Sequence, residues 1–224
     1  EAAARFLDNV CGVSGIDPNT EVLHSIGSKA ALSILPAAFI NPGDYVIMTI
    51  PGYPVFGTHA KYYGGQVHNL ALTAENNYLP DLDSIPTDVL AKAKVLVLNY
   101  PNNPTGAALS DASMDAIAEM TARHGAWIMA DEVYAGAETG VEKTRSFWGC
   151  HDKVLVTNSL SKAYGLPGLR LGWILGPSEL IEKLWGHTDY TTIAVASVSD
   201  ALACVALEPE TRDRIMARTR GIVR

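Results

Sequence analysis

The chain contains few of the residues that build disulfide-linked or zinc-binding proteins. Among its 224 residues are three cysteines, Cys11, Cys150 and Cys204, which are far apart and show no CxxC spacing. An odd number of scattered cysteines argues against a disulfide framework and against a zinc site. The six histidines form neither an HExxH motif nor an HxH pair. We therefore expect no metal site and no network of disulfides.

Long apolar runs and blocks of one charge are also absent. No apolar run approaches the roughly 20 residues that a membrane-spanning helix needs. The formal net charge is −7 and no basic block is present. These features argue against nucleic acid and membrane as partners. With 48% hydrophobic and 18% charged residues, the composition is typical of a cytoplasmic globular domain with a substantial core.

Two common enzyme motifs are missing as well. No GxGxxG follows a strand-like run, which argues against a dinucleotide-binding dehydrogenase. No GxSxG elbow is present, which argues against a serine hydrolase of the α/β-hydrolase type.

What the sequence does contain is an alternation of short apolar runs with helical patterns. Strands are expected at residues 20–25, 45–49, 67–72, 95–98, 127–130, 154–156 and 171–175. Helices are expected at residues 1–10, 27–39, 83–93 and 194–207. Further helices are expected from the turn at residues 51–54 to about residue 63, after a cap at Ser110, around residues 180–185 and from residue 209 onward. Pro36 should kink or shorten the helix that it lies in. The alternation predicts an α/β fold of three layers, α/β/α, with a mostly parallel sheet.

Residues 158–173 combine hydroxyls, glycines and two cations directly after a predicted strand. They read Asn-Ser-Leu-Ser-Lys-Ala-Tyr-Gly-Leu-Pro-Gly-Leu-Arg-Leu-Gly-Trp. Ser159 and Ser161 offer hydroxyls, and Arg170 offers a planar guanidinium suited to phosphate. Burial of Lys162 at the strand end would desolvate its amine and make it nucleophilic. A lone lysine in a glycine-rich loop is usually just solvated, so this segment needs support from the rest of the chain.

Other polar residues also follow predicted strands, and in open α/β sheets ligands bind at the carboxyl ends of the strands. The segment Gly27-Ser28-Lys29 opens a helix, so its free backbone N–H groups form an anion site, although Gly-Ser is also an ordinary helix cap. The remaining candidates are Tyr53 in a Pro-Gly-Tyr-Pro turn, Asn103 in Asn-Asn-Pro-Thr-Gly, and Asp131 and Tyr134 in Asp-Glu-Val-Tyr. Taken singly, such an aromatic is more often a packing residue and such an acid more often solvated.

Together, these five segments resemble the class I/II aminotransferases, which are pyridoxal 5′-phosphate (PLP) enzymes with the aspartate-aminotransferase fold. In that family a serine stands three residues before the active-site lysine and an arginine eight residues after it, as Ser159 and Arg170 stand around Lys162. The loop around Asn103 resembles the family's Asn-Pro-Thr-Gly loop. The resemblance covers nearly the whole chain, and the segments occur in the family's order.

The resemblance implies a role for each of these residues. Lys162 would form the Schiff base with PLP and move a proton between the substrate Cα and the cofactor. Asp131 would pair with the pyridinium nitrogen, whose proton makes the ring an electron sink. Asn103 and Tyr134 would donate hydrogen bonds to the phenolic oxygen, and Tyr53 would stack on the ring. The implied phosphate contacts are Gly27, Ser28, Lys29, Ser159 and Arg170.

The chain begins without Met in one helical pattern and ends in another, so we expect it to be part of a longer polypeptide. By resemblance, residues 1–208 form a PLP-binding large domain, and residues 209–224 begin a helix that leads to a small C-terminal domain. In the family that small domain carries the arginine that pairs with the substrate carboxylate, so we expect little or no turnover from this chain alone. The resemblance also implies a homodimer, with residues 187–193 near the neighbouring subunit's site.

Three functions are compatible with these residues. The first is an aminotransferase that exchanges an amino group between an amino acid and a 2-oxo acid. The second is another PLP-dependent reaction on an amino acid, namely β-elimination or replacement, cyclisation or oxidation. The third is a non-catalytic PLP-sensing domain of a transcriptional regulator. Because Lys162, Asp131 and Tyr134 would serve all of these, the sequence favours the first without identifying its amino acid.

Overall fold

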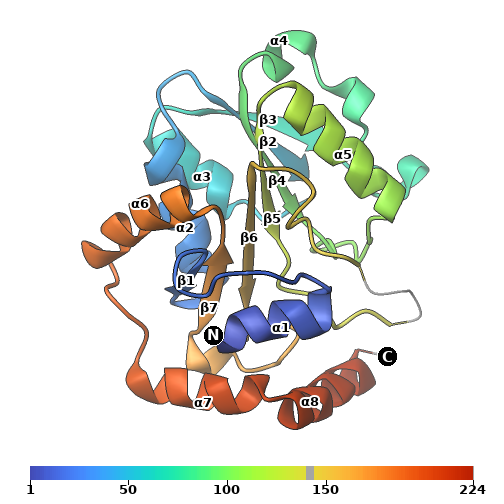
Figure 1. Ribbon diagram of the computed structural model, residues 1–224. Helices are drawn as coiled ribbons and strands as arrows, with labels where there is room; N and C mark the ends of the chain where they lie inside the picture. Colours follow the sequence, from blue (N-terminus) through green and yellow to red (C-terminus); the bar gives the residue numbers. More distant parts are fainter. Residues whose placement is uncertain (140–143, 224) are drawn as a thin grey trace.

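A computed structural model describes residues 1–139 and 144–223, and in these residues a seven-stranded sheet lies between layers of helices (Figure 1). The strands are β1 Val22–Ser25, β2 Tyr45–Ile50, β3 Gln66–Ala71, β4 Ala93–Asn99, β5 Trp127–Asp131, β6 Val154–Ser159 and β7 Gly172–Leu175. Their order across the sheet is β1-β7-β6-β5-β4-β2-β3. The pairs β2–β3, β2–β4, β4–β5 and β5–β6 are parallel, whereas β7 runs antiparallel to β6 and β1. The predicted mostly parallel sheet is confirmed.

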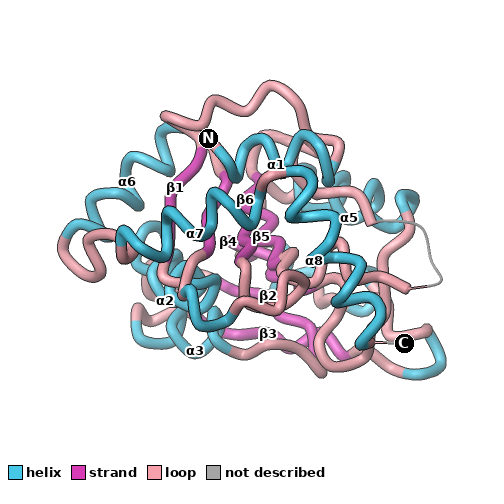
Figure 2. Tube along the Cα trace, turned by 90° about the horizontal axis from the view of Figure 1, so that it is seen from below, coloured by secondary structure: helices cyan, strands magenta, loops and turns pink. Residues whose placement is uncertain are grey.

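Helices cover both faces of the sheet, which confirms the three-layer prediction. They are α1 Ala2–Cys11, α2 Gly27–Phe39, α3 Val55–Tyr62, α4 Thr87–Leu90, α5 Asp111–Arg123, α6 Ser178–Asp189, α7 Ser197–Leu207 and α8 Pro209–Ile222, with 3₁₀ turns η1 Ala74–Asn76, η2 Leu82–Ser84 and η3 Pro167–Leu169. Helices α2, α3 and α6 lie on one face. Helices α1, α5, α7 and α8 lie on the other, as the view from below also shows (Figure 2).

The side chains of β6 show how the apolar pattern produces these layers. All six residues of this strand are buried. Val154 and Val156 pack into the core beneath α1 and α5, whereas Leu155 packs into the core beneath α2 and α6. A central strand covered on both faces needs apolar residues at successive positions, because each neighbour points to the opposite face. Within residues 1–139 and 144–223, no helix is both long and apolar enough to cross a bilayer.

One helix prediction was wrong. The helix expected at 83–93 is replaced by η2 and the single turn α4, because Pro86 has extended backbone (φ −58°, ψ 140°) between them and residues from Ala93 onward join β4. Pro36 lies inside α2, which continues to the predicted end at Phe39, so of the two effects expected of this proline the shortening does not occur. Full burial of Leu35 and the bond from Ile40 N–H to Pro36 O keep this last turn on the core.

Gly172, the first residue of β7, packs where no side chain fits. A Cβ there would lie 2.6 Å from Asn158 O and 3.0 Å from both Gly27 C and Ser159 Cβ. These are mainly backbone contacts, so relief would require Gly172 to move away from β6 and from the start of α2. We expect Gly172→Ala to lower the free energy of unfolding by about 1–3 kcal/mol, measured by urea titration.

Gly168 provides the matched control, since a Cβ at this position meets no heavy atom within 4 Å. Gly168→Ala should leave the free energy of unfolding within about 1 kcal/mol of wild type, with any change in the stabilising direction. Equal losses for the two variants would show that the close approach at Gly172 does not determine stability.

Candidate active site

Arg170 and the N-terminus of α2 form the cationic end of the candidate site. Gly27 has φ +69°, and a Cβ on it would lie 2.7 Å from Arg170 Nη2. The guanidinium donates to Pro167 O at 2.9 Å, and to Ser161 Oγ and Ile26 O at 3.4 Å. Arg170 is exposed, so the guanidinium and the free N–H groups of the first turn of α2 can share one anion.

The predicted serines lie at this same end. Ser28 is half-buried in the first turn of α2. Ser159 is fully buried at the end of β6, and its Oγ accepts a hydrogen bond from Ser161 N–H at 3.3 Å. The strand register places Gly172 between Ser25 of β1 and Ser159 of β6. The structure thus brings together segments from residues 25–28, 159–161 and 170.

Asp131 forms the acidic end, at the carboxyl end of β5. Its side chain is buried, and its Oδ1 accepts a hydrogen bond from Thr157 Oγ1 at 3.1 Å. Burial raises the pKa of Asp131 from 3.8 to about 7, while the Thr157 hydroxyl, the Val133 N–H and the charge of Lys162 act in the opposite direction. A cation that binds at this carboxyl would favour its ionised form.

Lys162 lies between these two ends, and its charge reaches Asp131. Lys162 is exposed, so burial within this chain does not desolvate its amine. The physical reason is local: Gly165 N–H donates to Lys162 O at 2.9 Å and closes a turn beyond the end of β6. Lys162 therefore lies just beyond the carboxyl end of β6, outside the core.

Tyr134, Tyr53 and Asn103 surround the acidic end. Burial, together with the neighbouring Asp131 and Tyr53, raises the pKa of the half-buried Tyr134. The Lys29 ammonium lies 5.9 Å from the centre of the Tyr53 ring, within cation–π range. Tyr134 and Asn103 both line a cavity of about 670 Å³. The predicted residues thus gather along one edge of the sheet.

Asn99, which the sequence reasoning passed over, joins two of these loops. Its Nδ2 donates to Asp131 O at 2.9 Å, and its Oδ1 accepts from Asn103 N–H at 3.1 Å. Thr157 was also missed, although it holds the Asp131 carboxyl. Both are buried polar residues near the ends of apolar strands, which is the signal that could have identified them.

Comparison with known proteins identifies the family. The family described as aminotransferase class I and II matches residues 1–223. The chain belongs to this family.

Similar proteins agree with this assignment. An LL-diaminopimelate aminotransferase from Methanocaldococcus jannaschii is 46% identical over 82% of this chain and 44% of its own length. One from Nitratidesulfovibrio vulgaris is 34% identical over the whole chain and 58% of its own length. A Thermus thermophilus aspartate aminotransferase mutant superimposes with a TM-score of 0.92 at 26% identity, over 99% of this chain and 61% of that one. The chain spans about half the length of the curated relatives that it matches.

The class I and II aminotransferases depend on PLP, and the site fits that cofactor in two respects. The space beside Gly27 that a Cβ would fill is next to the Arg170 guanidinium, as an anionic phosphate group requires. At the other end, the buried Asp131 carboxyl suits a protonated ring nitrogen. The two ends carry opposite charge, as do the two ends of the cofactor.

The raised pKa of Asp131 makes the stability of the cofactor-free protein depend on pH. The folded state keeps the Asp131 carboxyl protonated up to pH about 7, whereas the unfolded state keeps it protonated only up to about 4. The stabilisation that results from this difference is fully present below pH 4 and is lost as pH rises through 7. Asp131→Asn has no carboxyl to ionise, so the variant does not lose stability in this way. We therefore expect its free energy of unfolding, relative to wild type, to be higher at pH 8 than at pH 5 by on the order of 2 kcal/mol, measured by urea titration without PLP.

Asp8→Asn, at an exposed position on α1, is the control for removing a carboxylate. It should give the same difference from wild type at both pH values. An Asp131→Asn effect that does not change with pH would contradict the raised pKa.

Proposed function

We propose that this chain is the PLP-binding part of an aminotransferase that exchanges an amino group between an amino acid and a 2-oxo acid. The observation that carries the proposal is the placement of Lys162 between a buried acid, Asp131, and an exposed cation, Arg170, at one edge of the sheet. Family membership supports the same conclusion.

In this proposal, the residues divide the cofactor between them. Lys162 binds PLP covalently through its amine. Tyr53 lies against the ring face, and Asp131, Asn103 and Tyr134 bind the ring nitrogen and the phenolic oxygen. The phosphate is held by the first turn of α2 with Gly27, Ser28 and Lys29, and by Ser159 and Arg170.

When bound, PLP supplies an electron sink for the electron pair left as the substrate Cα loses its proton. The Asp131 carboxylate holds a proton at the ring nitrogen, and its burial strengthens that pairing. The Tyr134 hydroxyl donates a hydrogen bond to the phenolic oxygen. The Lys162 amine would act as general base and acid, moving a proton between the substrate Cα and the cofactor.

We propose LL-diaminopimelate as the first amino acid to test, since the relatives described above carry that name. The alternative reactions and the sensor function gain no support from these relatives, which are aminotransferases. A product analysis tests the proposal, because amino transfer converts the added 2-oxo acid to its amino acid without releasing ammonia.

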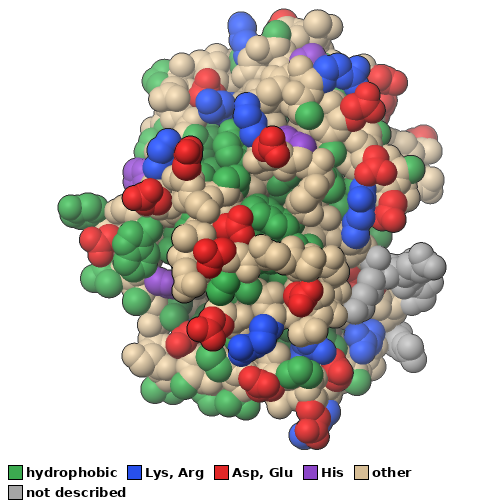
Figure 3. Space-filling model, in the orientation of Figure 1, with side chains coloured by type: hydrophobic (Ala, Val, Ile, Leu, Met, Phe, Trp, Pro, Cys, Tyr) green, Lys and Arg blue, Asp and Glu red, His purple; other side chains and the backbone are tan. Residues whose placement is uncertain are grey.

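The domain division, the subunit arrangement and the location also remain proposals. We propose that residues 1–208 form the large domain, that residues 209–224 lead into a small C-terminal domain, and that the full-length protein is a cytoplasmic homodimer. Exposed apolar side chains support a homodimer. Hydrophobic side chains gather at the left edge of Figure 3, near α6. The exposed large apolar residues in this part of the sequence include Trp185, Tyr190, Ile193 and Val198.

Lys162→Ala tests the covalent role. In the full-length protein loaded with PLP, borohydride should fix the cofactor on the peptide that contains Lys162, as mass spectrometry would show. Amino transfer from LL-diaminopimelate to a panel of 2-oxo acids should be detectable in wild type and lost in Lys162→Ala. Weaker, reversible PLP binding should remain, because the phosphate contacts are intact.

Lys153→Ala is the matched control, since Lys153 is exposed and donates to Gly125 O at 2.9 Å, outside the gathered site residues. It should keep both label and transfer. A label that maps to Lys153 or Lys29 would overturn the assignment, and ammonia release without amino transfer would count against the aminotransferase proposal.

The phosphate contacts should differ in strength. Arg170 offers a charged donor, and bonds to charged groups contribute about 1.5–3 kcal/mol, so Arg170→Ala should weaken PLP binding about 10- to 100-fold. Ser159→Ala should weaken it less, because the Ser159 hydroxyl is neutral and already accepts from Ser161 N–H. Fluorescence titration with PLP measures both; equal small effects would show that the phosphate lies elsewhere.

A further inference from the structure

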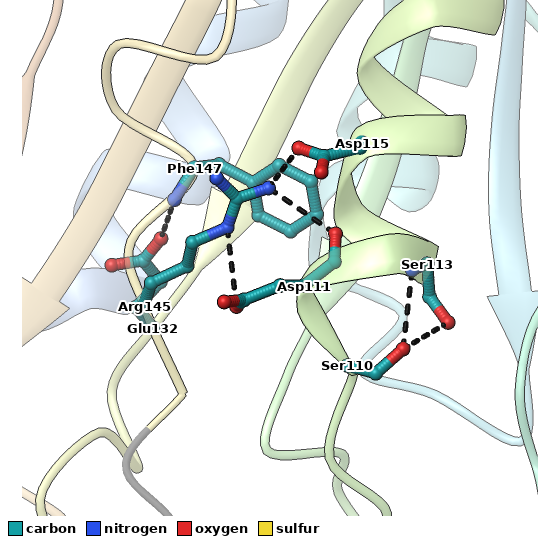
Figure 4. A network of polar contacts seen from close by, with 7 residues as sticks. All are labelled: Ser110, Asp111, Ser113, Asp115, Glu132, Arg145 and Phe147. Atoms are coloured by element: carbon teal, nitrogen blue, oxygen red, sulfur yellow. Dashed lines mark hydrogen bonds and ion pairs between the residues drawn. The ribbon is translucent and has the colours of Figure 1, made fainter.

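Glu132 is a second buried carboxyl at the end of β5, and the proposed reaction does not use it. It is 5% exposed. Its Oε1 accepts hydrogen bonds from Phe147 N–H at 2.9 Å and from Ser146 Oγ at 3.1 Å, as the close-up shows for Phe147 (Figure 4). Burial raises the pKa of Glu132 from 4.5 to about 7; the neighbouring Asp131 carboxyl acts in the same direction, and the hydrogen bonds from Phe147 and Ser146 oppose it. A buried carboxyl with two donors is costly to remove, because the donors would lose their partner.

The segment that Glu132 binds is itself fixed on its other side. Arg145 pairs with Asp111 at 3.3 Å and with Asp115, both on α5 (Figure 4). The Phe147 side chain is 3% exposed and packs in the core beneath α1 and α5. Ser146 Oγ also accepts from Trp148 N–H at 3.1 Å. Residues 145–148 thus form an anchor that is tied to α5 and to the core.

From Glu132, backbone bonds lead to the proposed catalytic lysine. Glu132 N–H donates to Thr157 O on β6 at 2.9 Å, and Ala135 N–H donates to Glu132 O at 3.0 Å, which closes the turn that carries Tyr134. In the middle of that turn, Val133 O accepts from Ala163 N–H at 3.3 Å. Ala163 is the residue next to Lys162. The turn therefore contacts the backbone on which the lysine stands.

We propose that Glu132 is a positioning residue for the cofactor site: by holding the turn 131–135 to the anchor 145–148, its carboxyl fixes Tyr134 and, through Val133 O, the backbone beside Lys162. This inference rests on the proposed function for its significance. The contacts that carry it belong to the chain itself, so placement can be measured without the cofactor.

Two readouts test the proposal. In the cofactor-free protein, Glu132→Ala should speed hydrogen–deuterium exchange in the peptide that contains Ala163. In the loaded full-length protein, it should weaken PLP binding by about tenfold, the equivalent of one charged hydrogen bond. It should also move the pH midpoint of the absorbance of PLP on Lys162 by more than about 0.5 unit. Glu132→Gln retains a carbonyl acceptor for Phe147 N–H and should restore all three values to near wild type.

Arg145→Ala is the control for a purely structural role, because it loosens the same anchor from α5 without touching the Glu132 carboxyl. It should lower the urea midpoint of unfolding, and it should change the Ala163 exchange and the pH midpoint less than Glu132→Ala does, because Phe147 still packs in the core. Equal changes in Arg145→Ala and Glu132→Ala would overturn the proposal, as would wild-type exchange, affinity and pH midpoint in Glu132→Ala.

Ser146→Ala keeps the test decisive if Glu132→Ala fails to fold. It removes one of the two donors, so it should give smaller changes in the same direction, and no change would count against the proposal. The two failures are distinguishable. If wild type binds no PLP at Lys162, the proposed function is wrong, whereas the exchange of Ala163 in the cofactor-free variants still decides the role of Glu132.

Discussion

A carboxyl group buried at the end of a parallel strand needs hydrogen-bond donors and a nearby cation before it can ionise. Asp131 meets this requirement through residues from several elements. Thr157 comes from β6, the Val133 N–H from the following turn, and Lys162 from the loop beyond β6. The buried acid therefore depends on the pairing of β5 with β6, and the lysine loop lies where that pairing ends.

The fold places the acidic group and the cationic group of the site at opposite ends. Parallel pairing brings the ends of β4, β5 and β6 to one edge, with Asn103, Asp131 and Lys162 following them. The antiparallel strand β7 begins at Gly172 beside the start of α2, and Arg170, two residues before it, lies beside Gly27. An acid stands at one end and a cation at the other. This arrangement suits an elongated ligand with a cationic ring and an anionic phosphate, as PLP is.

Several features of fold and site could be predicted from the chain alone. The buried strand around Val156 and the cap at Ser110, whose Oγ accepts from Ser113 N–H, depend on local apolar runs and local bonds. The resemblance around Lys162 supplied the family, which the comparisons confirm. The helix expected at 83–93 failed because one extended proline, Pro86, outweighed the helical pattern around it.

The sequence by itself determined most of the order of the elements, the family and which side chains are candidates for the chemistry, because these follow from local periodicity and from motifs of fixed spacing. Only the tertiary structure decided how those side chains are supported. Asn99 bridges Asp131 and Asn103, and Glu132 binds a segment that begins more than a dozen residues later in the chain. Such contacts depend on strand register and on how loops fold back, and a buried polar residue finds its partner only when the sheet has assembled.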